Sequence, residues 1–169
     1  ENVLEIKEGQ RGIVILESCP FYAEAGGQIG DSGKIINING EFSVKDTQKK
    51  GNANLLFGKQ VSGIFKVNDV AQAEIDQIKR ENIKLNHSAT HLLHSALIKN
   101  IGRDVQQKGS LVSDEKLRFD FSCEKPIKRE VLNSIEAEVN QIIEKNIPAI
   151  TRVMNKEEAI SEGAIALFG

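Results

Sequence analysis

The stretch GKIININGEFSVKD, residues 33–46, predicts a β-hairpin. An apolar, β-branched run leads into the dipeptide Asn39-Gly40, which is a strong signal for a hairpin turn. After the turn, polar and apolar residues alternate and place Phe42 and Val44 on one face. A second alternating run lies at residues 60–67. Several short strands at this spacing indicate a small β-barrel or sandwich in the N-terminal part of the chain.

The pattern changes after residue 68. Asn68 and Asp69 are each able to cap a helix, and the apolar spacing of residues 70–97 is helical, with a break expected near Asn86. Further along the chain we expect a strand at 117–121, a helix at 127–143, a strand at 149–153 and a short helix capped by Asn155. The fold class is therefore predicted as α+β, with a small N-terminal β-barrel at residues 1–68 followed by an α+β core at residues 69–169.

The composition excludes several classes of protein. The chain has 169 residues, of which 40% are hydrophobic, so it can bury a core. Its net charge of −2 argues against RNA binding by bulk charge, because stand-alone nucleic-acid binders are usually basic. Two cysteines are too few for a secreted disulfide scaffold, and no apolar run approaches the ~18 residues of a membrane span. We therefore expect a cytoplasmic protein with no membrane partner.

The ends of the sequence suggest a piece of a longer protein. Met154 is the sole methionine, and the chain stops at Phe168-Gly169 inside an apolar run. We expect both ends to be cuts, with a processed or trimmed terminus as the alternative.

All three histidines lie in the stretch HSATHLLH, residues 87–94. His87 and His91 are four positions apart, so on a helix they share a face and are able to aim two imidazoles at one zinc ion. His94 lies near the same face. The alternative is that these are ordinary surface or packed histidines. A zinc-protease site is disfavoured, because Ser88 stands where that motif places its general-base glutamate.

A glycine-rich segment, FYAEAGGQIGD at residues 21–31, is the second candidate. Gly26 and Gly27 allow the backbone to approach a ligand closely, and Gln28 offers hydrogen-bond donors and an acceptor without ionising. A tight turn with no ligand is the competing interpretation. The segment lacks the lysine and hydroxyl of a phosphate loop.

Two further features have weaker signals. The polar residues of VQQKGSL at 105–111 are suited to lining a cleft, where Lys108 would meet a phosphate, but a turn into a strand explains them equally. Basic residues around the histidine stretch suggest a phosphate-facing surface, although solvated charge is the more frequent cause. They are Lys79, Arg80, Lys99, Arg103, Lys108, Lys116 and Arg118.

Taken together and in order, five segments resemble the editing domain of alanyl-tRNA synthetases and the related free-standing alanyl-tRNA editing proteins. They are FYAEAGGQIGD at 21–31, NHSATHLLH at 86–94, VQQKGSLV at 105–112, LRFDFS at 117–122 and GAIALFG at 163–169. The third and fifth segments favour the synthetase. The chain departs from the family pattern at Ala25, where a serine is usual, and at Cys123, where a histidine is common.

The resemblance implies hydrolysis of the ester in tRNA(Ala) mischarged with serine or glycine, by the editing part of an enzyme that also performs ATP-dependent aminoacylation with alanine. It implies that His87 and His91 are zinc ligands. The other two ligands belong to a Cys-x3-His segment that follows the Ala-Leu-Phe-Gly strand, so the zinc site here is expected to be incomplete.

The resemblance also implies roles for other side chains. Gln28 would reach the ester or the amino acid, and Thr90 or Ser88 would hydrogen-bond a serine side chain. Substrate or tRNA contacts are expected at Gly26, Gly27, Gln107 and Lys108, and the remainder of the synthetase chain is a further expected partner.

Three alternatives remain open at this point. The first is a free-standing aminoacyl-tRNA deacylase. The second is a non-catalytic RNA-binding module with a structural zinc. The third is an unrelated metal hydrolase.

Overall fold

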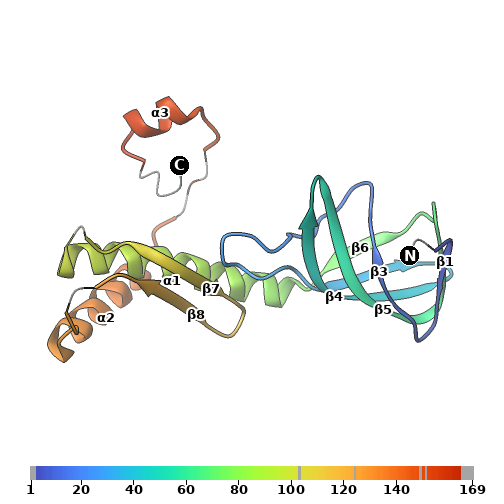
Figure 1. Cartoon of the computed structure of the whole chain (residues 1–169), viewed down its shortest axis with the longest axis horizontal. Helices are drawn as coiled ribbons and strands as arrows, with labels where there is room; N and C mark the ends of the chain where they lie inside the picture. The colour runs from blue at the N-terminus through green and yellow to red at the C-terminus, as the bar shows by residue number, and fades with distance from the viewer. Residues whose placement is uncertain (1–2, 103, 124, 149, 151, 165–169) are drawn as a thin grey trace.

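The computed structural model describes residues 3–102, 104–123, 125–148, 150 and 152–164. Figure 1 shows a β-sheet at one end of the molecule and a long helix that leads away from it, with a two-stranded sheet and a second helix beside that helix. The strands are β1 (Glu5–Lys7), β2 (Arg11–Val14), β3 (Gly33–Asn37), β4 (Gly40–Lys50), β5 (Ala53–Lys66), β6 (Gln72–Ile75), β7 (Gln107–Val112) and β8 (Leu117–Phe121). The helices are α1 (Gln77–Ile101), α2 (Arg129–Glu144) and α3 (Lys156–Ser161).

The α+β class is confirmed, and the predicted hairpin is present. β3 and β4 pair antiparallel, with Asn37 opposite Gly40, so the connecting turn is at Ile38 and Asn39, one residue earlier than the predicted Asn39-Gly40. Phe42 and Val44 are both buried, at 0% and 1% exposure, as their alternation predicts. Local sequence signals therefore define the centre of the N-terminal sheet.

The predicted small N-terminal β-barrel is not closed. The strands form an open antiparallel sheet in the order β1-β5-β4-β3-β6, with β2 also pairing with β5. Two register shifts between β4 and β5 increase the local twist of the sheet. Closure would need β6 to pair with β1 or β2, but β6 has four residues and is followed almost at once by α1. Within the described residues, the two edges of this sheet stay unpaired with each other.

The sheet encloses the larger of two hydrophobic clusters. Its buried members are Phe21, Ile35, Phe42, Val44, Leu56 and Phe65. Phe21 lies in the segment before β3, so the core also fixes the beginning of the glycine-rich segment. The second cluster joins α1, α2 and the β7–β8 hairpin through Ala96, Leu97, Val105 and Ile135.

The change from strand to helix comes later than predicted. Residues 72–75 form β6, which pairs with β3, and the helix begins at Gln77. Asp76 is the cap, since its side chain accepts a hydrogen bond from the Lys79 amide at 3.0 Å. Asp69 instead accepts from the Lys66 amide at 2.9 Å in the turn after β5. The division of the chain into domains at residues 68 and 69 stays a prediction.

Helix α1 is continuous over 25 residues, and the predicted break near Asn86 is absent. The Asn86 side chain does not interrupt the helix, because it donates outward to the Ser113 carbonyl at 2.9 Å. In the part of the chain that the structure describes, no helix combines the length and apolar character needed to cross a membrane.

The elements near the C-terminus agree with local signals where they are described. The predicted strand at 117–121 and helix at 127–143 correspond to β8 and α2, and Asn155 caps α3 by accepting from the Glu158 amide at 2.8 Å. The strand predicted at 149–153 and the segment at 163–169 lie partly outside the described residues.

We predict that Phe42→Ala lowers the free energy of unfolding by about 3–5 kcal/mol, because it leaves a cavity in the sheet's core. Ile38→Ala is the control, since Ile38 is 97% exposed on the neighbouring turn and its loss should change stability by less than about 0.5 kcal/mol. Urea unfolding measures both variants. Equal losses of stability would contradict this assignment of the core.

Candidate functional site

The glycine-rich segment forms a tight turn at residues 25–28. The Ala25 amide donates to the Gln28 carbonyl at 3.2 Å, and the Gln28 amide donates to the Ala25 carbonyl at 3.0 Å. Gly26 and Gly27 have φ of 59° and 86°, which is the sign pattern of a type I′ turn and favours glycine at both positions. The turn interpretation and the site interpretation are therefore compatible, because the turn is what presents Gln28.

The turn is docked on the end of β7. The Val112 amide donates to the Gly27 carbonyl at 2.8 Å, and the Ile29 amide donates to the Val112 carbonyl at 3.1 Å. A Cβ at Gly27 would lie 2.6 Å from the Ser110 carbonyl oxygen, so this approach requires glycine. These two bonds connect the N-terminal sheet to the β7–β8 hairpin.

The docked turn aims Gln28 at the first histidine of α1. Gln28 is 7% exposed, and its Oε1 lies 2.6 Å from Nδ1 of His87. A carboxamide oxygen only accepts hydrogen bonds, so this contact requires the proton on Nδ1 of His87. The neutral ring then keeps its lone pair on Nε2, the arrangement that a metal-binding histidine needs.

The two predicted ligands are neighbours on α1. The rings of His87 and His91 are stacked, with centroids 5.0 Å apart and planes at 19°. His91 is exposed, whereas His87 is half-buried. The sequence prediction that these imidazoles share one helix face next to the glycine turn therefore matches the geometry.

The third histidine is separate from this pair. His94 is 7% exposed and packs against Phe119 of β8, with ring centroids 5.0 Å apart. Its Nε2 is buried without a hydrogen-bond partner in the part of the chain that the structure describes. His94 thus faces the hairpin and the second hydrophobic cluster.

The donor set fits a zinc ion only in part. His87 and His91 supply two imidazoles, whereas a zinc site takes three or four protein ligands. Among the residues that the structure describes, there is no group of three or more His, Cys, Asp or Glu side chains placed to hold a metal ion. The histidine pair can therefore be half of a site but not all of one.

The two predicted hydroxyl residues differ in availability. Thr90 is 7% exposed, and its Oγ1 donates to the Asn86 carbonyl at 2.8 Å. Its oxygen can still accept a hydrogen bond, but its proton is in use. Ser88 is exposed and follows His87 directly on α1. Of the two, Ser88 is the hydroxyl that a ligand in solution reaches.

Gln107 and Lys108 lie just outside the residues of β7 that contact the glycine turn. Both lie at the start of β7, and the turn contacts this strand from Ser110 to Val112. Lys108 is two positions and Gln107 three positions from Ser110, which corresponds to about 7–10 Å along the strand. Lys108 is exposed, and its Nζ donates to Oε1 of Gln106 at 3.2 Å. Their roles in binding the substrate stay a prediction.

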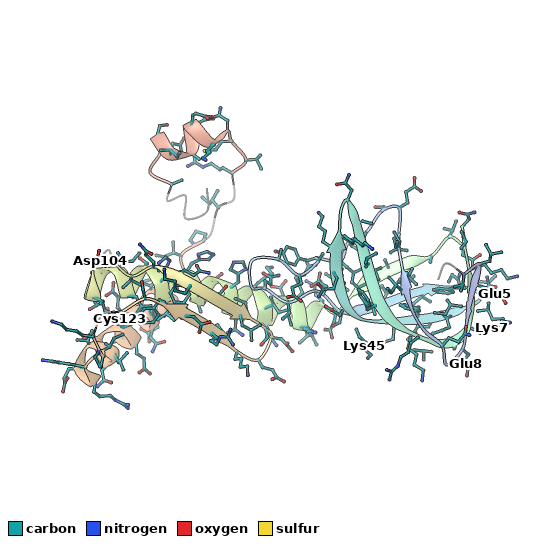
Figure 2. The ribbon with its side chains drawn as sticks, viewed as in Figure 1. Glu5, Lys7, Glu8, Lys45, Asp104 and Cys123 are labelled. Carbon is teal, nitrogen blue, oxygen red and sulfur yellow. The ribbon has the colours of Figure 1, made fainter. Side chains whose placement is uncertain are left out.

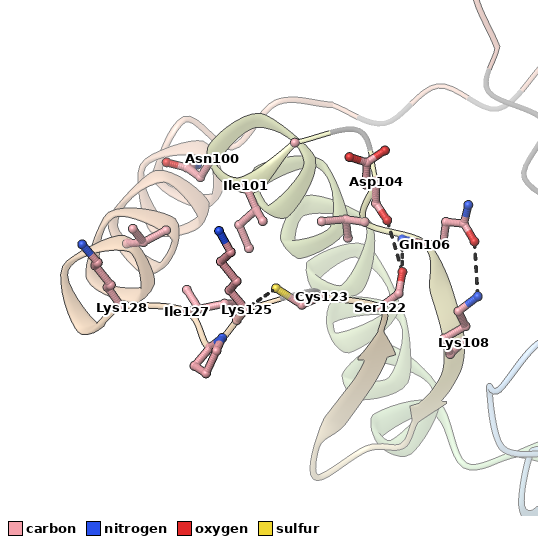
Figure 3. A pocket seen from close by; sticks show the side chains of 14 residues that line it. Asn100, Ile101, Asp104, Gln106, Lys108, Ser122, Cys123, Lys125, Ile127 and Lys128 are labelled. Carbon is pink, nitrogen blue, oxygen red and sulfur yellow. Dashed lines mark hydrogen bonds between the residues drawn. The ribbon is translucent and has the colours of Figure 1, made fainter.

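A cavity of about 650 Å³ lies at the end of the hairpin where β7 begins (Figure 3). Asn100, Lys108, Cys123 and Ile127 are among the residues that line it. Figure 2 shows Asp104 and Cys123 at the end of the molecule opposite Glu5. The cavity contains neither Gln28 nor a histidine, so the histidine pair, and not the cavity, is the place for the predicted chemistry.

The predicted basic surface is neutralised only in part. Lys99 pairs with Glu138 at 2.8 Å, and Arg118 pairs with Asp120 at 3.1 Å. Arg80 pairs with Asp31, and Arg103 lies outside the described residues. Internal pairing therefore accounts for three of the six described members, whereas Lys79, Lys108 and Lys116 form no ion pair with a described residue.

The sequence interpretation missed an ion pair that joins the glycine-rich segment to α1, between Asp31 and Arg80. Asp31 accepts from Nε of Arg80 at 2.8 Å and is 2% exposed. A signal for this pair existed, because Arg80 precedes His87 by two helical turns and Asp31 belongs to the same segment as Gln28.

Burial, and to a smaller extent the charge of His91, lower the pKa of His87. We predict that His91→Ala raises this pKa toward the ordinary value without reaching it, because burial remains. Proton NMR titration of the His87 imidazole, in the metal-free protein and in its His91→Ala variant, measures the change. An unaltered pKa would show that His91 exerts no influence on His87.

The lowered pKa of His87 also predicts how the free energy of unfolding depends on pH. A lowered folded-state pKa means that the unfolded chain binds the proton more readily, so the contribution of neutral His87 is complete above about pH 6.5. That contribution is lost as the pH falls from there through the folded-state pKa. In His87→Gln, unfolding measured between pH 7.5 and 5 should show a weaker loss of stability on acidification. A steeper loss in the variant would contradict the sign of the shift.

A comparison with known families bears on the first half of this site. The family model described as "tRNA synthetases class II (A)" matches residues 1–79. The match includes the N-terminal sheet, the glycine turn, Gln28 and Asp31, and it ends in the first turn of α1, before His87. Over residues 1–79, this chain is therefore similar to the class II (A) tRNA synthetases.

Proposed function

We propose that the chain is the editing part of an alanine–tRNA ligase and hydrolyses the ester of tRNA(Ala) mischarged with serine or glycine. The family match over residues 1–79 supports a synthetase-related function. The resemblance of the segments at 21–31 and 86–94 to the editing domain supports the more specific activity. tRNA is the partner that follows from both.

The observation that carries the proposal is the contact between Gln28 and His87 at 2.6 Å. The two side chains come from the two most characteristic segments of the resemblance, which are 59 positions apart in the sequence. Folding brings them together beside a second imidazole and an exposed hydroxyl. Their convergence supports a site that spans both segments.

Each group in this site has a chemical task in ester hydrolysis. Within the described residues no acceptor is hydrogen-bonded to Nε2 of Gln28, so this amide is able to donate to the ester carbonyl. Neutral His87, with its proton fixed on Nδ1, offers Nε2 as a metal ligand or a base. Ser88, which is exposed and follows His87 on α1, would hydrogen-bond a serine side chain and so select the wrong amino acid over alanine.

A zinc ion would be held by His87 and His91 together with ligands beyond the described residues. When bound, it would supply polarisation of the ester carbonyl or orientation of the aminoacyl group. The half-buried His87 and the exposed His91 leave the outer side of the pair open to such a group.

We predict that Gln28→Ala lowers the rate of serine release from seryl-tRNA(Ala) by about 100-fold, the usual cost of removing one preorganised donor. Gln72→Ala is the matched control, because Gln72 is an exposed glutamine of β6 whose side chain bonds only Glu74 among the described residues. The rate is measured with zinc present, in the full-length protein encoded by the gene from which this chain comes. Binding of tRNA without any cleavage would instead favour a non-catalytic RNA-binding module.

A further inference from the structure

A second contact joins the glycine-rich segment to α1, two helical turns before His87. The guanidinium of Arg80 binds the Asp31 carboxylate through both groups of atoms: Nε to Oδ1 at 2.8 Å, and the second nitrogen, Nη2, to Oδ2. Paired bonds of this kind fix both distance and orientation. Asp31 is 2% exposed, so water competes little for the contact.

Asp31 is itself held rigidly by the N-terminal sheet. Its Oδ2 accepts from the Tyr22 amide at 2.6 Å, and its amide donates to the Tyr22 carbonyl at 2.9 Å. Its own carbonyl accepts from Oγ1 of Thr47, a fully buried residue of β4, at 2.9 Å. The carboxylate therefore has a fixed position, and Arg80 must come to it.

The spacing of the four residues defines a register between segment and helix. Gln28 and Asp31 are three positions apart in an irregular segment, and Arg80 and His87 are seven positions apart on α1. Seven residues are close to two turns, so Arg80 and His87 lie on one helix face about 10 Å apart along the axis. A rotation of α1, or a slide along its axis, that broke one contact would also displace the other.

We propose that Arg80 is a positioning residue, which by binding Asp31 holds α1 in the register where His87 meets Gln28. Its effect on hydrolysis rests on the proposed function, whereas its effect on the Gln28–His87 contact does not. Arg80 touches neither imidazole and acts through the placement of the helix.

The primary test compares Arg80→Gln with Arg80→Lys and with the control Lys84→Gln in the metal-free, substrate-free protein. Lys84 lies on the same helix, but its ion pair with Glu81 is exposed. The readouts are the NMR signals of the Gln28 carboxamide and the methyl signals of Ile35 and Leu56 in the sheet core. Arg80→Gln should shift the carboxamide signals of Gln28 away from the positions that mark its hydrogen bond to His87. The methyl signals of the sheet core should stay in place.

Arg80→Lys keeps the positive charge and one hydrogen bond to Asp31, so the Gln28 carboxamide signals should lie closer to those of the unmodified protein. Lys84→Gln should leave these signals unchanged. Unshifted Gln28 carboxamide signals in folded Arg80→Gln would overturn the proposal. Loss of the core signals together with that of Gln28, in Arg80→Gln and Asp31→Asn alike, would also overturn it, because the pair would then be merely structural. If Arg80→Gln does not fold, Asp31→Asn, which keeps the shape of the side chain, is read by the same criteria.

A double-mutant cycle on the rate of seryl-tRNA(Ala) hydrolysis gives a second test. Misplacement by about 1 Å can cost about 100-fold, so we expect Arg80→Gln alone to lower kcat by about 10- to 100-fold. If Arg80 acts through Gln28, it should have little further effect in Gln28→Ala, whereas full additivity would contradict the coupling. No hydrolysis by the unmodified protein would refute the proposed function, and the NMR result would still decide the role of Arg80.

Discussion

The main-chain bridge between Gln28 and Val112 is the contact on which the arrangement of the site depends. It is made of backbone groups, so its only strict demand on side chains is at Gly27, where Ser110 leaves no room for a Cβ. The Asn86 side chain bonds the carbonyl of Ser113, next to Val112, and so ties α1 to the same point. Three segments that are far apart in the sequence therefore meet at the end of one short strand.

The choice of an amide at position 28 has an electrostatic effect. A carboxylate there would stabilise the imidazolium form of His87 and raise its pKa. The neutral oxygen of Gln28 orients the ring without adding charge, and burial then keeps the pKa of His87 low. A neutral imidazole with one defined tautomer is the form that serves as a metal ligand or a base, so Gln28 and the partial burial of the ring favour the same state.

Local sequence signals were enough to predict the core positions of β4, the cap of α3 and the shared face of two histidines. Alternation placed Phe42 and Val44 in the core, Asn155 capped α3, and a four-residue spacing put His87 and His91 on one face. The errors involved partners distant in the sequence. Whether the sheet closes depends on the pairing of its edges, and the residues before Gln77 form a strand because β3 is available to them.

The unbroken length of α1 has a mechanical consequence. Its 25 residues form a stiff rod about 37 Å long, whose first turn is pinned to the sheet through Arg80 and whose far end borders the cavity at Asn100. A tilt of about 5° at the pinned end would move the far end by about 3 Å, simply by leverage over that length. One unbroken helix thus runs from the ion pair beside the glycine turn to the border of the remote cavity.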